Sequence, residues 1–258
     1  MNKNAMVEEL AAVLRNAEKT KQAIPPLSDV YDLDIADAYK VQLRNIDRRV
    51  QEGAIITGKK IGLTSLAMQE MLGVSEPDYG HIFEEVHFDE TIKTDLFIQA
   101  KVEGEVAFVL KEDLVGPNIT VEDVLANTDY VVAALEIVDS RIADWKIKLV
   151  DTIADNASFG GYCLGKKQLK VNECDLKTLH MDLYKNGELM NSGKGTDVLG
   201  DPAFCVAWLA NKMSEFGIAL KKGEVVLSGA FSAALPVAKG DIFEARFTQL
   251  GSVFGRFE

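Results

Sequence analysis

The feature that most constrains this chain is the run 131–138, which is apolar throughout except for a single carboxylate, Glu136. A short aliphatic and β-branched run of this kind predicts a buried strand. Burying an unpaired carboxylate costs several kcal/mol, so either a basic residue or a metal ion must lie against Glu136. Arg141 is the nearest basic residue in the sequence, but its odd spacing from Glu136 puts it on the opposite strand face, beside Asp139. We therefore expect Arg141 to pair with Asp139 and to leave Glu136 to another partner.

Two further carboxylates, Glu103 and Glu105, lie in a second strand-like run, 102–110. Because side chains alternate along a strand, both carboxylates point to one face and can converge on a single cation. With Glu136 they would form an all-oxygen site, which suits Mg²⁺ or Mn²⁺ better than zinc. The sequence therefore predicts a hard divalent cation that keeps coordination positions open for water or substrate.

The N-terminal part of the chain has helical patterns. Apolar residues spaced by three and four positions predict a helix over residues 6–21. A second helix is expected over residues 35–52, with Asp34 as its N-cap. Thr64 or Ser65 can cap a third helix. This part of the chain is thus expected to be mostly helical.

From about residue 76 the sequence changes to short β-branched runs separated by Gly, Pro and Asn, which predicts mainly sheet. Asn186-Gly187 marks a hairpin turn between two of the strands. We expect an α+β fold with a small helical N-terminal region, residues 1–75, and a larger mixed-sheet catalytic domain, residues 76–258. The expected strands include 102–110, 130–138, 225–227 and 242–247, and the expected interrupting helices are 121–127 and 203–216.

The charge balance limits the partners of this chain. Its 40 acidic and 28 basic residues give a formal net charge of −12, which opposes binding to a phosphate backbone, so we expect no nucleic-acid partner. Glu8 and Glu9 stand where a signal peptide needs its apolar stretch, and no run approaches the ~20 apolar residues of a membrane span. We therefore expect a cytoplasmic protein. Its three cysteines are odd in number and lack a C-x-x-C pair, which indicates small buried residues rather than disulfides or a zinc site.

Several stretches spread over nearly the whole chain carry a family resemblance: Gly58–Ser65, Pro77–Gly80, Val102–Phe108, Glu136–Arg141, Asp151–Ser158, and the tail from Gly251 to Phe257. Together they resemble the 2-keto-4-pentenoate hydratase family within the fumarylacetoacetate hydrolase superfamily, which implies the fold of that superfamily. The resemblance also implies that Glu103, Glu105 and Glu136 hold the metal. It further implies that Lys60, Asp78 and Ser158 line the substrate, and His81 directly follows one of these stretches as a further candidate for substrate contact.

The activity that the resemblance implies is that of a hydro-lyase in aromatic meta-cleavage catabolism. Such an enzyme adds water to 2-hydroxypenta-2,4-dienoate (2-keto-4-pentenoate), or to a close relative, and gives a 4-hydroxy-2-oxo acid. We expect Lys60 and Asp78 to transfer the protons, with the choice of acid and base left open. A partly buried lysine beside a divalent cation is expected to have a lowered pKa.

Three alternatives remain open from the sequence. The chain also resembles 4-oxalocrotonate decarboxylases, although these tend to carry an apolar residue at the place of Asp78, so Asp78 favours the hydratase. A substrate with a second carboxylate is the second alternative. The third is a non-catalytic partner subunit of a decarboxylase. We expect a homo-oligomer in any case, and the resemblance adds a complex with a related decarboxylase.

Overall fold

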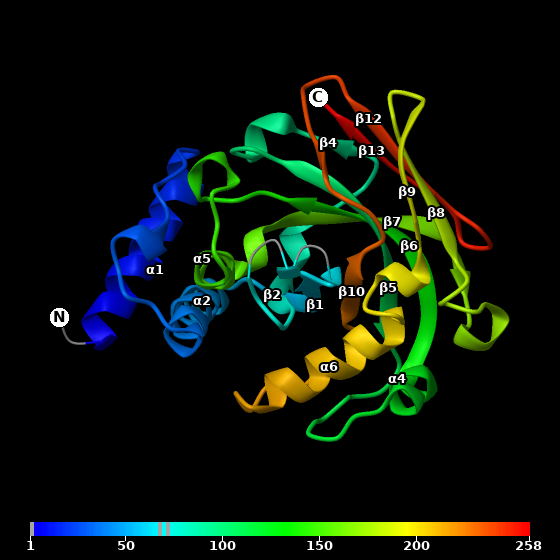
Figure 1. Ribbon diagram of the computed structural model, residues 1–258, viewed down its shortest axis with the longest axis horizontal. Helices are drawn as coiled ribbons and strands as arrows, with labels where there is room; N and C mark the ends of the chain where they lie inside the picture. Colours follow the sequence, from blue (N-terminus) through cyan, green and yellow to red (C-terminus); the bar gives the residue numbers. More distant parts are fainter. Residues whose placement is uncertain (1–2, 67–68, 71–72) are drawn as a thin grey trace.

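The protein, seen in a computed structural model that describes residues 3–66, 69–70 and 73–258, has the predicted α+β fold (Figure 1). Helices α1 (Lys3–Thr20) and α2 (Ile35–Gln51) lie together at one side of the molecule. Asp34 caps α2 by accepting a hydrogen bond from the backbone amide of Asp37, as its position predicts. The third predicted helix falls partly on residues 67–68 and 71–72, which lie outside the described residues.

The large sheet is mixed and has the strand order β2-β1-β10-β5-β6-β7-β3, with β11 paired to β5. Strand β1 runs parallel to β10, and β3 runs parallel to β7, whereas the other pairs are antiparallel. Since β1 belongs to the first 75 residues, the N-terminal region contributes a strand to this sheet. The strands are β1 (Ile56–Gly62), β2 (Asp78–Phe83), β3 (His87–Phe88), β5 (Lys101–Leu110), β6 (Thr128–Val138), β7 (Phe159–Leu169), β10 (Val225–Ala230) and β11 (Leu235–Pro236).

A second sheet has the order β4-β13-β12-β8-β9 and packs on the large one. Its strands are β4 (Thr91–Ile92), β8 (His180–Lys185), β9 (Glu188–Lys194), β12 (Ile242–Phe247) and β13 (Gly251–Phe257). The turn at Asn186 and Gly187 joins β8 to β9, and both residues have positive φ, 54° and 83°, as the predicted hairpin requires. Gly104 on β5 lets the sheets approach, because a Cβ there would lie 3.0 Å from Met181 Sδ and 3.3 Å from Ala245 Cβ.

Three further helices complete the described fold. Helix α4 (Val121–Asn127) begins with the predicted capping box of Thr120 and Asp123. Helix α6 (Pro202–Ser214) begins after its N-cap Asp201 and packs against β10 and β1. Helix α5 (Leu149–Ala154), which the sequence analysis does not include, packs against α2 and β2.

The register of the large sheet decides which side chains share a face. Lys60 on β1 lies opposite Leu227 on β10, and Leu227 lies opposite Ala107 on β5. Directly opposed residues share a face, so Lys60 lies on the same face as Ala107 and therefore as Glu103 and Glu105. Buried apolar residues continue this face beyond the charged ones, namely Ile82, Ala107, Val132, Ala134 and Leu227. The charged residues are thus held against a packed apolar layer.

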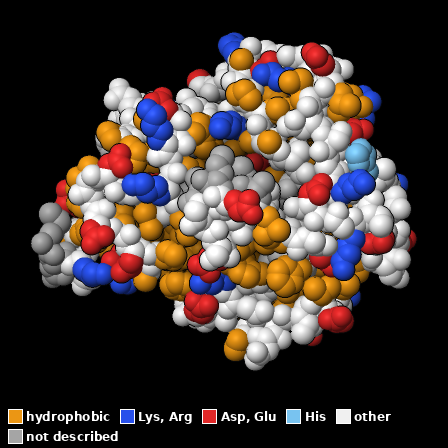
Figure 2. Space-filling view, in the orientation of Figure 1, with side chains coloured by type: hydrophobic (Ala, Val, Ile, Leu, Met, Phe, Trp, Pro, Cys, Tyr) orange, Lys and Arg blue, Asp and Glu red, His pale blue; other side chains and the backbone are white. Residues whose placement is uncertain are grey.

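Charged side chains of both signs are spread over the surface of the viewed face (Figure 2). Figure 2 shows Lys and Arg side chains interspersed with Asp and Glu on the viewed face rather than gathered in one basic patch. Among the described residues, no helix combines the length and the apolar character needed to cross a membrane.

The parallel contact between β1 and β10 generates the first prediction. A Cβ at Gly58 would lie 2.1 Å from the carbonyl oxygen of Val225, so Gly58→Ala must push two paired backbones apart. We expect a loss of about 1–3 kcal/mol in the free energy of unfolding, the usual effect of overpacking. Chemical denaturation measures it. Gly255→Ala is the matched control, because its new Cβ would meet only side-chain atoms at 3.3 Å or more. Equal effects of the two substitutions would contradict this account.

Candidate active site

Three carboxylates meet on the inner face of the large sheet. Glu103 and Glu105 lie on β5, and Glu136 lies on β6 directly opposite Glu103. One carboxylate oxygen of each lies within 4.8 Å of the others, so the three converge as the alternation of strand side chains predicts.

The oxygens of these carboxylates are left free for a cation. Glu105 accepts a hydrogen bond from the amide of Gly229 on one oxygen, at 2.9 Å. Its other oxygen is buried and accepts no hydrogen bond from the described residues, and the buried carboxylate of Glu136 has Nζ of Lys60 as its charged neighbour, 3.0 Å from Oε1. Buried carboxylate oxygens that accept no hydrogen bond are rare, because leaving a buried acceptor unpaired costs free energy. The donor set therefore fits a hard divalent cation held by Glu103, Glu105 and Glu136.

Burial and mutual repulsion change the acidity of the three groups. Burial, followed by the charge of Glu136, raises the pKa of Glu103 to about 7. Burial raises the pKa of Glu105 well above its ordinary range, and the charges of Glu136 and Glu103 add to the effect. Burial also raises the pKa of Glu136, against the opposing charge of Lys60. In the absence of a cation, bound protons therefore neutralise part of the negative charge of these carboxylates, and they compete with a metal ion for the same oxygens.

Lys60 is the basic partner of Glu136. Its Nζ lies 3.0 Å from Oε1 of Glu136 and donates a hydrogen bond to the carbonyl oxygen of Ala157 at 3.1 Å. Burial lowers the pKa of Lys60, but the nearby carboxylates, Glu136 and then Asp78, raise it by more, so the net pKa is above the ordinary value. In the metal-free protein, four surrounding carboxylates thus outweigh burial, and the expectation of a lowered pKa beside a bound cation stays a prediction.

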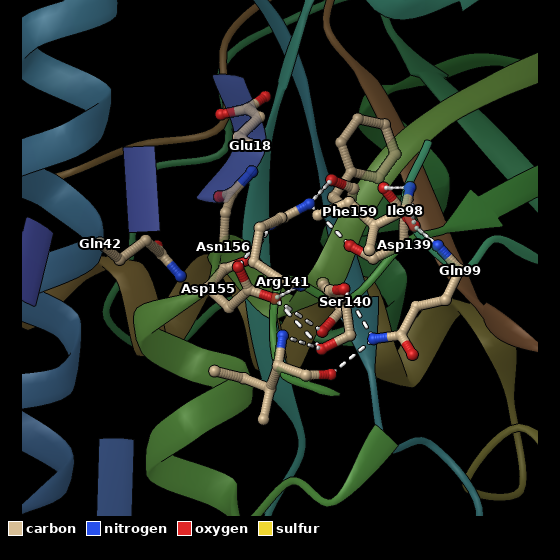
Figure 3. A network of polar contacts seen from close by, with 12 residues as sticks. Glu18, Gln42, Ile98, Gln99, Asp139, Ser140, Arg141, Asp155, Asn156 and Phe159 are labelled. Carbon is tan, nitrogen blue, oxygen red and sulfur yellow. Dashed lines mark hydrogen bonds and ion pairs between the residues drawn. The ribbon is translucent and has the colours of Figure 1, made fainter. Parts of the chain in front are cut away.

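The predicted pair of Asp139 and Arg141 is also wrong. Nε of Arg141 lies 2.5 Å from Oδ1 of Asp155, and Nη1 donates to the backbone carbonyl of Asp139 rather than to its side chain (Figure 3). The carboxylate of Asp139 instead accepts hydrogen bonds from the amides of Ile98 and Gln99. The spacing argument places Arg141 away from Glu136 but does not detect Asp155, which comes from another element.

Asp78 begins β2 and lies opposite Gly62, on the same face as Lys60. Its Oδ2 accepts a hydrogen bond from Oγ1 of Thr152 at 2.9 Å, and its Oδ1 is buried without a hydrogen-bond donor in the described chain. Burial raises the pKa of Asp78, against Lys60 and Thr152. A Cβ at Gly62 would lie 2.3 Å from Oδ1, so this glycine makes room for Asp78.

A cavity of about 530 Å³ opens beside these groups. Lys60, Asp78, Glu103 and Ser158 line it, so the structure brings four predicted site residues to one space. Glu105 and Glu136 lie fully buried behind Glu103. The wall also contains residues that the sequence analysis does not single out for the site, namely Leu63, Lys101, Val138, Trp145, Ile147, Thr152, Ala157, Asp197 and the segment 230–234.

His81 lies apart from this cavity. It is opposite Lys59 in the strand register, on the sheet face away from Lys60 and Asp78. Burial, and then the charge of Lys59, lower the pKa of His81 to about 3, so the ring is neutral at ordinary pH. The odd spacing between Asp78 and His81 could have shown this, because it places their side chains on opposite faces. We leave His81 out of the proposed substrate contacts.

Comparisons with known proteins agree with this geometry. Residues 86–258 match the family model described as fumarylacetoacetate (FAA) hydrolase, C-terminal. The chain is 45% identical to a 2-keto-4-pentenoate hydratase of Paraburkholderia xenovorans (strain LB400), over 97% of this chain and 94% of that protein. It is 40% identical to a 2-oxo-hept-4-ene-1,7-dioate hydratase of Escherichia coli, over 96% of each chain.

A solved structure is similar over the whole fold. The 4-oxalocrotonate decarboxylase from Pseudomonas putida G7, complexed with magnesium and adipate, is 36% identical and superposes with a TM-score of 0.95. The alignment covers 99% of this chain and 98% of that one. A divalent metal is thus present in a close structural relative, in accord with the carboxylate cluster described above.

The raised pKa values predict that metal binding depends on pH. The pKa of Glu103 is about 7 in the folded, metal-free chain, against about 4.3 for an unfolded glutamate. The stability linked to this proton is present below pH of about 4.3 and is lost as the pH rises through 7. Mg²⁺ needs the ionised form. We therefore expect the increase in Tm caused by Mg²⁺, relative to EDTA, to be small near pH 5 and to grow toward pH 8.

At each pH, the quantity to measure is the Tm with Mg²⁺ minus the Tm with EDTA. The titration of His81 changes stability with the opposite sign, but it affects both Tm values equally and cancels in the difference. Glu103→Gln removes one of the three carboxylate ligands and should reduce the increase in Tm caused by Mg²⁺ at every pH. The exposed Glu90→Gln should retain it and serves as the control. If this difference in Tm is the same from pH 5 to pH 8, protons do not compete with Mg²⁺ for the three glutamates, and the prediction is wrong.

Proposed function

The chain belongs to the 2-keto-4-pentenoate hydratase family of the fumarylacetoacetate hydrolase superfamily, and on that premise we propose that it hydrates 2-hydroxypenta-2,4-dienoate or a close relative. The product is a 4-hydroxy-2-oxo acid of aromatic meta-cleavage catabolism. One observation carries the proposal: three converging carboxylates, two of them fully buried, adjoin a cavity that also presents Lys60 and Asp78. Turnover of 2-hydroxypenta-2,4-dienoate by the purified protein, with and without Mg²⁺, tests it.

We propose Mg²⁺ or Mn²⁺ as the ion, held by Glu103, Glu105 and Glu136, because all the ligand atoms are oxygens. When bound, such an ion supplies Lewis-acid polarisation to a 2-oxo acid. The ligand carboxylates are already converged on neighbouring strands, so little reorganisation is needed to bind it.

Lys60 is proposed as the proton donor. Glu136 and the carbonyl of Ala157 fix its ammonium group at the cavity wall. A fixed ammonium stabilises negative charge that develops on a substrate oxygen, and it can deliver a proton as that charge grows.

Asp78 is proposed as the proton acceptor. Thr152 orients the carboxylate through Oδ2, while Oδ1 keeps a free lone pair on the same sheet face as Lys60. Its raised pKa makes the ionised form a stronger base than an exposed aspartate, which suits removal of a proton from the attacking water. The two groups thus divide the acid and base work.

The cavity wall supports a short, largely apolar substrate tail. The apolar side chains that line the cavity include Val138, Trp145, Ile147 and Phe231. These side chains exclude water from the reacting atoms and fit a vinyl or short alkyl group. Lys101, whose Nζ lies 4.2 Å from the centre of the Trp145 ring, is the cation that a second carboxylate could meet.

A decarboxylase is the second candidate, favoured by the similarity to the 4-oxalocrotonate decarboxylase structure. The same carboxylate cluster and cavity would serve either reaction. Parallel assays with 2-hydroxypenta-2,4-dienoate and 4-oxalocrotonate separate them, because release of CO₂ from the second compound would favour the decarboxylase.

We further propose a cytoplasmic homo-oligomer that can associate with a related decarboxylase. Large apolar side chains lie exposed on β9, an edge strand, at Leu189 and Met190, and a further one lies on α6 at Phe204. Such residues are the ones that an assembly would cover. Sedimentation of the purified protein as a monomer at micromolar concentration would contradict the oligomer.

Asp78→Asn tests the proposed base. Asparagine keeps the shape and the hydrogen bond to Thr152 but cannot take a proton, so we expect kcat to fall by about 10² or more while the affinity for Mg²⁺ stays nearly constant. Steady-state kinetics and a metal titration measure the two quantities. The exposed Asp113→Asn is the control and should leave both unchanged. A kcat within about threefold of wild type would remove Asp78 from the mechanism.

A further inference from the structure

The segment 156–158 has an unusual backbone. Asn156, Ala157 and Ser158 have φ values of 54°, 51° and 51°, a left-handed turn made of three consecutive residues other than glycine. Residues with a Cβ rarely adopt this conformation one after another, so the surrounding structure must hold it. The segment links helix α5 to strand β7 at the wall of the cavity.

This turn contacts β1, which carries Lys60, and β2, which carries Asp78. The carbonyl of Ala157 accepts the hydrogen bond from Lys60 on β1. The side chain of Asn156 accepts from the amide of His81 on β2 and donates to the carbonyl of the same residue. Gly80 leaves room for this contact, because a Cβ there would lie 2.4 Å from the carbonyl oxygen of Asn156. A shift of the turn would therefore move the hydrogen-bond partner of Lys60.

A buried ion pair holds the turn at its start (Figure 3). Arg141 pairs with the carboxylate of Asp155 and also donates to the backbone carbonyls of Asp139, Asp155 and Phe159. It thereby ties together residues on both sides of the turn, 155 and 159. Both charged side chains are buried, with 9% exposure for Arg141 and 1% for Asp155.

The same carboxylate determines the direction of the hydroxyl group of Ser158. Oγ of Ser158 donates to Oδ2 of Asp155 at 3.2 Å. Oδ2 also accepts from the amide of Arg141 at 3.0 Å. Burial raises the pKa of Asp155 to about 6, with the charge of Arg141 opposing the rise, so the carboxylate is ionised at neutral pH. Because a hydroxyl has one proton, Ser158 has only lone pairs left for the cavity that it lines.

We propose that Arg141 and Asp155 are positioning residues that hold the left-handed turn and make Ser158 a hydrogen-bond acceptor toward an O–H group of the substrate or of the attacking water. The identity of that O–H group rests on the proposed hydratase function. The hold of Arg141 and Asp155 on the turn, which we call the clamp, follows from the contacts described above and does not depend on the proposed function.

Kinetic coupling tests the orientation of Ser158. We expect Asp155→Asn and Ser158→Ala each to lower kcat for 2-hydroxypenta-2,4-dienoate at saturating Mg²⁺ by about tenfold or more. If Asp155 acts through Ser158, the double variant loses no more than the worse single variant. If the loss of kcat in the double variant instead equals the product of the two single losses, the two residues act independently and the proposal is overturned. Arg141→Lys with Ser158→Ala gives a second cycle if Asp155→Asn does not fold, and Arg246→Lys, at an exposed pair with Glu244, is the control.

Hydrogen exchange tests the clamp without any assay of activity. In the wild-type protein the amide of Ser158, which donates to the carbonyl of Asp155, should exchange as slowly as the amides of β5. Arg141→Lys should speed its exchange at least tenfold while the β8–β9 hairpin keeps its wild-type rates. Rapid exchange of Ser158 in the wild-type protein would overturn the proposal. A wild-type protein with slow exchange but no turnover of the dienoate would instead contradict the proposed function.

Discussion

The structure depends on a concentration of buried charge inside one sheet. Glu103, Glu105, Glu136 and Asp78 lie around a single lysine, Lys60, on the inner face of the large sheet. Lys60 compensates one carboxylate directly, at 3.0 Å from Glu136, and the others remain in a region that disfavours charge. A divalent cation resolves this imbalance better than further lysines would, because it binds several carboxylates at once without adding bulk. The same imbalance explains why the pKa of Glu103 rises to about 7 when the chain is alone.

The segment 156–158 at the cavity wall stores backbone strain. Left-handed conformations cost roughly 1–2 kcal/mol for each residue with a Cβ, and Asn156, Ala157 and Ser158 adopt one in succession. This cost is a notable part of the 5–15 kcal/mol that stabilises a typical domain. The ion pair of Arg141 with Asp155 lies where it can offset that strain. Strain at a cavity wall, held by a buried pair, is typical of a functional site rather than of a simple connection.

Much of the fold follows from local patterns in the sequence. The capped helices, the Asn186-Gly187 hairpin and the strands through Glu103 and Glu136 are confirmed, because each rests on a short-range rule of spacing or turn geometry. The face shared by Glu103 and Glu105 follows from alternation alone. Strand β7 and helix α5 were not predicted, because β7 contains three glycines and ends in polar residues, and α5 has only six residues.

Long-range partners could not be predicted from local rules. The sequence analysis leaves the partner of Glu136 open and assigns the wrong one to Arg141, because Lys60 and Asp155 approach only through the tertiary fold. The roles of Lys60, Asp78 and Ser158 came from family resemblance, and the structure adds that all three line one cavity. In the metal-free protein the pKa of Lys60 is raised rather than lowered, since the surrounding carboxylates, whose number is not visible in the sequence, outweigh burial.

Alternate residues of β5 serve two different purposes, metal binding on one face and contact with the second sheet on the other. Glu103 and Glu105 face the cavity side, and Gly104 between them faces Met181 and Ala245 of the second sheet, where a side chain would not fit without displacement. A shift of β5 by one residue would therefore turn a glutamate toward the second sheet and remove it from the carboxylate cluster. New substrate preferences, whether selected in nature or in the laboratory, should arise instead at Trp145, Ile147 and Phe231, which border the cavity without carrying a catalytic charge.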